Sequence, residues 1–151
     1  VQSNDSLITV MLHTLAEQVT CEKILFRDQC TTTLSPSGAR FRATTPGDAS
    51  RLLPHQHGAS FLLEVEGAIA ASGGILFHYN PPYGDLYMEV AERRRGFGAY
   101  LVQELKRVCY EQGSVPVARC NAANVASRQT LQKAGFVPCG NLLSGKVRRP
   151  S

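Results

Sequence analysis

The stretch that decides the fold runs from residue 85 to residue 99 and reads DLYMEVAERRRGFGA. Its first part, Asp85 to Ala91, has the alternating pattern of a strand. Three arginines and two glycines follow, and Ala99 begins a helical pattern that reaches Gln112. Glycines in such a loop let backbone N–H groups converge on an anion, and arginines add forked donors suited to phosphate. The stretch predicts an anion-binding loop, and the plainer alternative is a helix start beside a solvated basic run.

The segments on either side give the order of the elements. Phe61 to Val65 and Ala68 to His78 are two further strand patterns, and short turns join them to each other and to residues 85–91, which favours an antiparallel meander. After the helix come a strand, a second helix and a last strand, over Val115 to Cys120, Val125 to Ala134 and Val137 to Val147. We therefore expect an α/β (α+β) fold with a mixed, mostly antiparallel sheet and one parallel pair made through a crossover helix.

The N-terminal part reads as an addition to this core. Residues 6–20 have helical spacing of apolar side chains, and residues 24–33 and 39–44 favour strands joined as a hairpin through Ser35 to Gly38. The next segment suggests one short helix broken at Pro54. We expect an N-terminal helix and strand extension over residues 1–38 and a core over residues 39–151 within a single compact domain.

Composition excludes several classes of protein. With 151 residues, 43% of them hydrophobic and 19% charged, the chain is neither disordered nor collagen-like. No apolar run approaches the roughly 20 residues that span a bilayer, and residues 1–22 lack the Lys or Arg of a secretory signal. The odd set of five cysteines has no C-x-x-C pair, which favours reduced thiols, a cytoplasmic location and no metal site. Because the chain begins at Val1, we expect its natural N-terminus to lie upstream or to have been trimmed.

Charge is divided unevenly along the chain. Residues 1–89 hold 5 basic and 9 acidic residues, whereas residues 90–151 hold 11 and 3. The basic half is suited to an anionic ligand, and the acidic half favours a cationic one. Nucleic acid is a poor candidate because the positive charge concentrates at one loop rather than on an aromatic-lined sheet. We expect no membrane partner, and a homodimer is left open.

A second segment makes the pattern specific. Residues 124–136 read NVASRQTLQKAGF. The order of R-x-x-G-x-G at residues 93–98, then N-x-x-S and K-x-G-F, resembles the GNAT superfamily of acetyl-CoA-dependent N-acetyltransferases, over roughly residues 40–140. The resemblance implies a GNAT-like fold in which the strands at residues 85–91 and 115–120 splay apart, with acetyl-CoA as cosubstrate in the gap between them. It also implies a small-molecule or peptide amine as acceptor.

The resemblance also assigns roles to residues. Backbone amides of the loop would bind the CoA pyrophosphate, the Val90 amide would hold the thioester oxygen, and Asn124 would contact the pantetheine arm. The full set of expected cofactor contacts is Val90, Ala91, Arg93, Arg94, Arg95, Gly96, Phe97, Gly98, Ala99, Asn124 and Ser127.

The chemistry of amide formation indicates the catalytic candidates. An amine with a pKa near 10 is mostly protonated at neutral pH, so a base must remove a proton before the amine attacks. Glu89 is the first choice for this base, Asp85 the second, and Tyr87 is a candidate acid; strand alternation places all three on one face unless a bulge intervenes.

One position departs from the family pattern. Where the family often has a tyrosine as general acid, this chain has Leu131. The departure lends weight to an alternative, a non-catalytic acetyl-CoA-binding regulatory module. A direct ternary-complex N-acetyltransferase is the main expectation, and a cationic amine is the expected acceptor because of the acidic first half.

Overall fold

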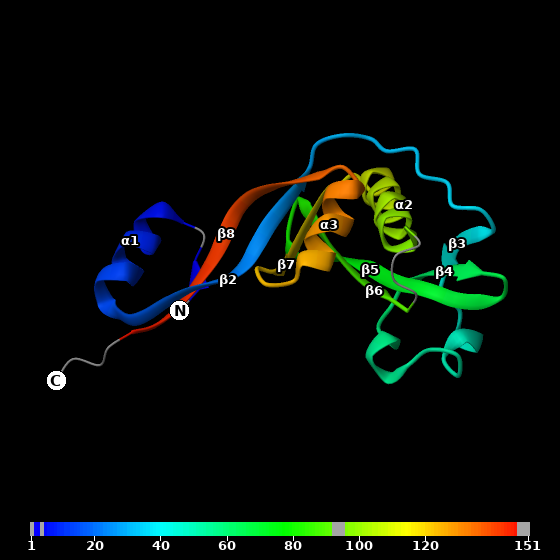
Figure 1. The fold of residues 1–151 in the computed structure, drawn as a ribbon, viewed down its shortest axis with the longest axis horizontal. Helices are drawn as coiled ribbons and strands as arrows, with labels where there is room; N and C mark the ends of the chain where they lie inside the picture. The colour runs from blue at the N-terminus through cyan, green and yellow to red at the C-terminus, as the bar shows by residue number, and fades with distance from the viewer. Residues whose placement is uncertain (1, 4, 92–95, 148–151) are drawn as a thin grey trace.

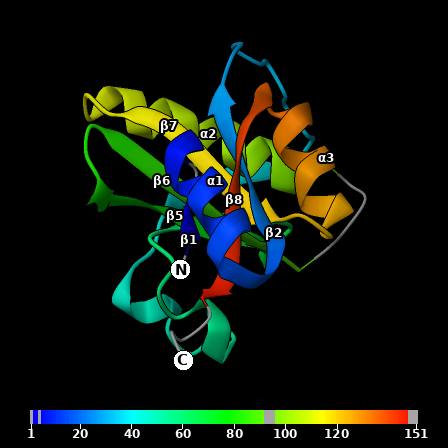
Figure 2. The same cartoon turned by 90° about the vertical axis from the view of Figure 1, so that its left-hand side faces the viewer.

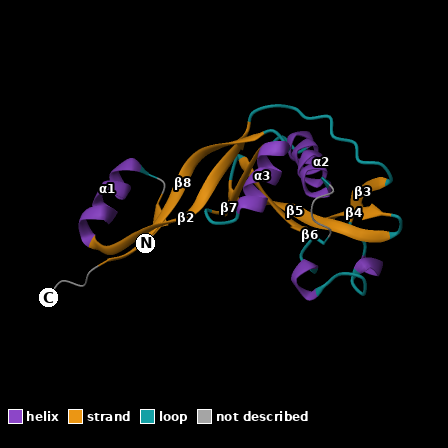
Figure 3. Ribbon diagram, in the orientation of Figure 1, coloured by secondary structure: helices purple, strands orange, loops and turns teal. Residues whose placement is uncertain are grey.

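The computed structural model describes residues 2–3, 5–91 and 96–147. Within them, eight strands form one sheet in the order β1-β8-β2-β7-β6-β5-β4-β3, and α2 and α3 lie on one face of it (Figures 1 and 3). The strands are β1 (Gln2–Ser3), β2 (Ala16–Asp28), β3 (Ala39–Ala43), β4 (Phe61–Val65), β5 (Ala68–Asn80), β6 (Tyr83–Val90), β7 (Val115–Asn121) and β8 (Phe136–Val147). The helices are α1 (Ser6–Leu15), α2 (Phe97–Glu111) and α3 (Val125–Lys133), with two 3-10 turns, η1 (Pro46–Asp48) and η2 (Pro54–Gln56).

The central part of the sheet has the expected topology. β4, β5 and β6 form an antiparallel meander, and β6 pairs with β7 in parallel through the crossover helix α2. The other strand pairs are antiparallel. The mixed, mostly antiparallel α/β sheet expected from the sequence is therefore confirmed.

The N-terminal hairpin expected between residues 24–33 and 39–44 is wrong. β2 lies inside the sheet between β7 and β8, whereas β3 pairs with β4 at the opposite edge. The chain between them crosses α2, where the Gln103 side chain binds both the N–H and the carbonyl of Leu34 at 2.7 and 3.0 Å. Two β-prone segments joined by a turn satisfy a local rule, but pairing with distant strands covers both sides of β2. The division of the chain at residue 38 stays a prediction.

The first helix is shorter than its pattern predicts. It ends at Leu15, and the backbone becomes extended at Ala16, which pairs with Val147 of β8. The far ends of β2 and β8 therefore form a ribbon that carries α1 away from the body of the protein (Figures 1 and 2). Both ends of the described chain lie on this arm. Pairing with β8 outweighs the helical spacing of residues 16–20.

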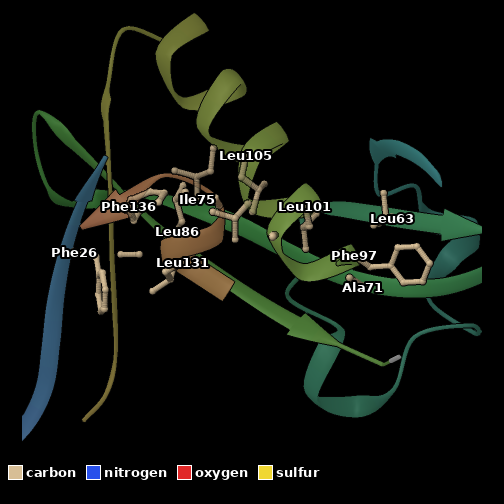
Figure 4. Packing of buried hydrophobic residues seen from close by; sticks show 14 of the residues in the cluster. Phe26, Leu63, Ala71, Ile75, Leu86, Phe97, Leu101, Leu105, Leu131 and Phe136 are labelled. Atoms are coloured by element: carbon tan, nitrogen blue, oxygen red, sulfur yellow. The ribbon is translucent and has the colours of Figure 1, made fainter. Parts of the chain in front are cut away.

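The main core lies between the sheet and the two helices (Figure 4). Leu101 and Leu105 of α2 are fully buried in one cluster with Ile75 and Leu86 of the sheet, and Leu131 of α3 joins the same cluster. Burying side chains of this size stabilises the fold by about 2 kcal/mol each. The cluster fixes α2 and α3 over β6 and β7, and so fixes the ground on which the site is built.

A buried lysine ties this core to the end of β2. The Lys106 ammonium on α2 pairs with Asp28 at 2.6 Å and donates to the carbonyls of Cys30 and Ala134, each at 2.8 Å. These partners satisfy all three donors of the ammonium, which is the condition for burying a charge without a large cost.

Candidate active site

The parallel pairing of β6 and β7 stops half-way along both strands. It runs from Tyr83 opposite Val115 to Leu86 opposite Ala118. β6 continues to Val90 and β7 to Asn121, but the far end of β7 pairs with β2 on its other side. The two strands part, as the sequence predicts, and a pocket of about 260 Å³ lies at the gap. Its lining comes from both strands, β2, β5, α2 and α3: Lys23, Leu76, Asp85, Leu86, Tyr87, Met88, Val102, Ala118, Arg119, Cys120, Ser127 and Leu131.

The backbone N–H of Val90 points toward this gap. Its neighbour Ala91 donates to the carbonyl of Ala70 at 2.9 Å, so Ala91 faces β5. Successive residues of an antiparallel ladder turn their N–H groups to opposite sides. Val90 and Met88 therefore direct theirs away from β5, toward the side where β7 has diverged. Two preorganised donors at an opening between strands can stabilise negative charge on an acyl oxygen.

The start of α2 has the geometry of an anion site. Gly96 is the N-cap residue with φ +79°, a left-handed conformation that costs other residues roughly 1 kcal/mol or more. A Cβ on Gly98 would lie 2.9 Å from Val90 and 3.1 Å from Thr130, so only glycine lets this first turn pack so closely on β6 and α3. Phe97 and Ala99 are buried in the same turn. Arg93, Arg94 and Arg95 lie outside the described residues.

Asp85, Tyr87 and Glu89 share the face of β6 opposite the helices. The register of β6 with β5 runs unbroken from residue 85 to residue 90, so no bulge swaps the two faces there. Val90 lies on the helix side, where it meets α2 at Gly98. The alternation expected from the sequence therefore holds in the structure.

The two carboxylates of this face have different surroundings. Asp85 is buried and pairs with Arg119 of β7 at 2.6 Å. Burial raises the pKa of Asp85, and the charge and hydrogen bond of Arg119 oppose that rise. Glu89 is 56% exposed, and its Oε1 lies 3.9 Å from Nε2 of His55. Glu89 is open to a substrate, whereas Asp85 is already engaged by a cation.

The candidate acids are less available. The Tyr87 hydroxyl donates to the carbonyl of Gly58 at 2.6 Å. Leu131 lines the pocket at the position where a tyrosine is expected, and burial raises the pKa of the nearby Cys120 thiol. A group that donates to a leaving thiolate is therefore not evident among the described side chains of the pocket.

Asn124 and Ser127 begin α3. The Asn124 side chain accepts the N–H of Ser127 at 3.0 Å, as an N-cap residue does, and Ser127 lines the pocket. The Asn124 oxygen is thus used by the helix, and its side-chain NH₂ is the group that would be offered to a ligand.

The segment with η1 and η2 lies beside the same face, and an ion-pair cluster holds it. Arg42 of β3 binds Asp48 at 2.6 Å and Glu64 of β4 at 2.8 Å, and Arg51 binds Glu64 at 2.8 Å. These bonds lower the pKa of Glu64 to about 2 and that of Asp48 well below its usual value. The sequence predicts one broken helix here; the structure has two 3-10 turns that bring Gly58 to Tyr87 and His55 to Glu89.

Sequence reasoning missed two residues of the pocket, Lys23 and Arg119. Arg119 follows from the alternation of β7, since its neighbours Ala118 and Cys120 are buried. Lys23 has no local signal because it reaches the pocket only through the pairing of β2 with β7.

Comparison with known families supports this geometry. The model of the acetyltransferase (GNAT) family matches residues 21–136. This chain belongs to the GNAT acetyltransferase family. No curated protein sequence matches the chain.

Solved structures of GNAT proteins share the fold. An acetyltransferase from the GNAT family of Colwellia psychrerythraea is 16% identical with a TM-score of 0.80, over 98% of this chain and 64% of that one. A GCN5-related N-acetyltransferase from Sphaerobacter thermophilus is 19% identical with a TM-score of 0.64, over 96% of this chain and 57% of that one. The present chain thus spans less than two thirds of either protein. At these identities the likeness concerns the fold alone.

Two further observations bear on the class of this GNAT protein. Among the described residues, no group of three or more His, Cys, Asp or Glu side chains is placed to hold a metal ion. None of the helices in that part of the chain combines the length and hydropathy needed to cross a bilayer.

Proposed function

We propose that the chain transfers an acetyl group from acetyl-CoA to a primary amine by direct attack in a ternary complex. The observation that carries the proposal is the gap between β6 and β7, with the Val90 N–H directed into it and the glycine-led start of α2 beside it. Family membership supports the acetyl donor, which supplies an activated thioester.

The residues present fit a bound CoA. The left-handed Gly96 and the tightly packed Gly98 keep side chains away from the first amides of α2, where a pyrophosphate would be held. Asn124 and Ser127 offer polar groups from the other helix, and the strand edge at Met88 and Val90 offers backbone donors to the pantetheine arm and the acyl oxygen. The basic loop residues Arg93 to Arg95 would add charge to the same end.

Glu89 is the base in this proposal. It takes a proton from the ammonium form of the acceptor, directly or through water, and the free amine then attacks the carbonyl carbon. A C–N bond forms, the C–S bond breaks, and the sulfur leaves as a thiolate. The Val90 N–H stabilises the negative charge that develops on the acyl oxygen. Because a thiol has a pKa near 8.5, the thiolate leaves without an acid at neutral pH, although more slowly than with one.

Turnover on a panel of amines tests the proposal. CoA release is followed with a thiol reagent on simple amines, amino acids, polyamines, aminoglycosides and peptides with free N-termini, with acetyl-CoA affinity measured in parallel. We expect CoA release and an acetylated product with at least one class of amine.

The second candidate, a non-catalytic acetyl-CoA-binding module, is favoured by Leu131 and by the engagement of the Tyr87 hydroxyl. Tight acetyl-CoA binding without CoA release across the whole panel would support it against the enzyme. The cytoplasmic location and a homodimer stay predictions.

A further inference from the structure

Three side chains that are charged at neutral pH line the pocket at the gap: Lys23, Asp85 and Arg119. They lie on the sheet face away from α2 and α3. Phe26 and Ala118 are opposite each other in the core under the helices, so the next pair, Leu25 and Arg119, faces the other way. Lys23 is two residues further along β2 and shares that face.

The charges of this group do not cancel. Arg119 is bound to Asp85 at 2.6 Å, with the two side chains 25% and 12% exposed. Lys23 is near enough to act on Asp85 electrostatically. One carboxylate therefore faces two cations, and the half-buried pocket carries one excess positive charge, which an anionic group of a substrate would balance.

Glu89 lies on the same face of the same strand, further toward the open end of the gap. Four residues of β6 separate it from Asp85, roughly 13 Å at the usual strand rise. One end of this face therefore offers a carboxylate for an amine, and the other offers Lys23 and Arg119 for an acid.

We propose that the acetyl acceptor is a primary amine that also carries a carboxylate, which binds Lys23 and Arg119 while the amine reaches Glu89. This inference rests on the proposed function and names its substrate class. It reverses the cationic acceptor favoured by the acidic first half of the sequence. A second ammonium group would lie against two cations whose carboxylate partner, Asp85, is already bound.

Three linear amines test the charge preference with chain length held constant: 5-aminopentanoate, pentylamine and 1,5-diaminopentane. The reacting amine is far from the variable end in all three. We expect kcat/KM about tenfold higher for 5-aminopentanoate than for pentylamine, because a charge-assisted hydrogen bond contributes about that factor, and lower still for the diamine. Equal values, or a preference for the diamine, would overturn the proposal.

Variants of Lys23 locate the effect in this pocket. Lys23→Met keeps the aliphatic stem and should abolish the advantage of 5-aminopentanoate while leaving pentylamine turnover within about twofold. Lys23→Glu should invert the order in favour of the diamine. Lys146→Met, which removes the same charge from an exposed position on β8, is the matched control and should change neither. A uniform loss on all three amines in Lys23→Met would contradict a role in acceptor choice.

A binding measurement separates this inference from the proposed function. Pentanoate and pentylamine are titrated by NMR into the protein saturated with CoA. We expect tighter binding of pentanoate, lost in Lys23→Met. If no amine is turned over but pentanoate still binds through Lys23, the enzyme proposal fails and the anion site stands. If pentanoate binds no better than pentylamine, the inference fails whatever the turnover.

Discussion

At the scale of residues, β6 gives two carboxylates opposite tasks. Asp85 lies where β6 still pairs with β7, and it is buried against Arg119. Glu89 lies beyond the last pair and is exposed. A base must exchange its proton with substrate and solvent during each turnover, which Glu89 can do and Asp85 cannot do without breaking an ion pair.

We expect Glu89→Gln to lower kcat about 100-fold, the usual contribution of a general base, with little change in acetyl-CoA affinity. At high pH the loss should shrink, because more of the acceptor is already deprotonated. Rates measured from pH 6 to 10 with the best acceptor test this. Glu17→Gln, an exposed carboxylate on the arm, is the control; an unchanged rate and pH profile in Glu89→Gln would remove Glu89 from the mechanism.

At the scale of elements, the start of α2 combines a left-handed Gly96 with a helix end packed on β6 and α3. The backbone conformation and the close packing both follow from having no Cβ, so the element depends on glycine for its geometry and for its proposed use. Gly67, in the turn between β4 and β5, has the same φ of +79° and open space around it.

Gly96→Asp and Gly67→Asp form a matched pair. Each should cost roughly 1 kcal/mol or more of folding free energy from the strained φ. Only Gly96→Asp places a negative charge beside the expected pyrophosphate, so it should weaken acetyl-CoA binding tenfold or more, while Gly67→Asp binds as the unaltered protein does. Calorimetry measures the affinities. Equal affinity in both variants would rule out anion binding at α2.

At the scale of the whole molecule, the segment with η1 and η2 depends on ion pairs rather than on a large apolar contact. Arg42 and Arg51 join Asp48 and Glu64, and so hold the segment to the β3–β4 edge. This arrangement connects the stability of the fold to pH.

The pKa of Glu64 falls from 4.5 to about 2 on pairing with Arg42 and Arg51. A lowered pKa means that its stabilisation is complete above pH 5 and is lost as the pH falls toward 2. Urea unfolding at pH 7, 5 and 3 should show a steeper decline in the native protein than in Glu64→Gln, which is also less stable at pH 7. Glu66→Gln, in the adjacent exposed turn, should keep the native slope; identical slopes in Glu64→Gln would contradict the prediction.

Local patterns predicted the meander, the helix–strand–helix half and the anion loop because each rests on neighbours in sequence. Alternation placed Asp85 and Glu89 on one face, and the unbroken register of β6 maintains it. The same local rules failed at the N-terminus. Residues 16–20 have helical spacing and residues 24–33 can form a hairpin, but both were overridden by pairing with β7 and β8, more than 90 residues away.

The sequence by itself determined the family, the meander with its crossover helix, the glycine-led loop and the candidate base, because each of these is written in contiguous residues. Only the tertiary structure decided the position of β2, the direction of the Val90 N–H and the excess positive charge of the pocket. Lys23 and Arg119 are 96 positions apart, and only the hydrogen bonding of β2 to β7 brings them beside Asp85. Charge counted along the chain favours a cationic acceptor, and charge assembled in space favours one that carries an acid.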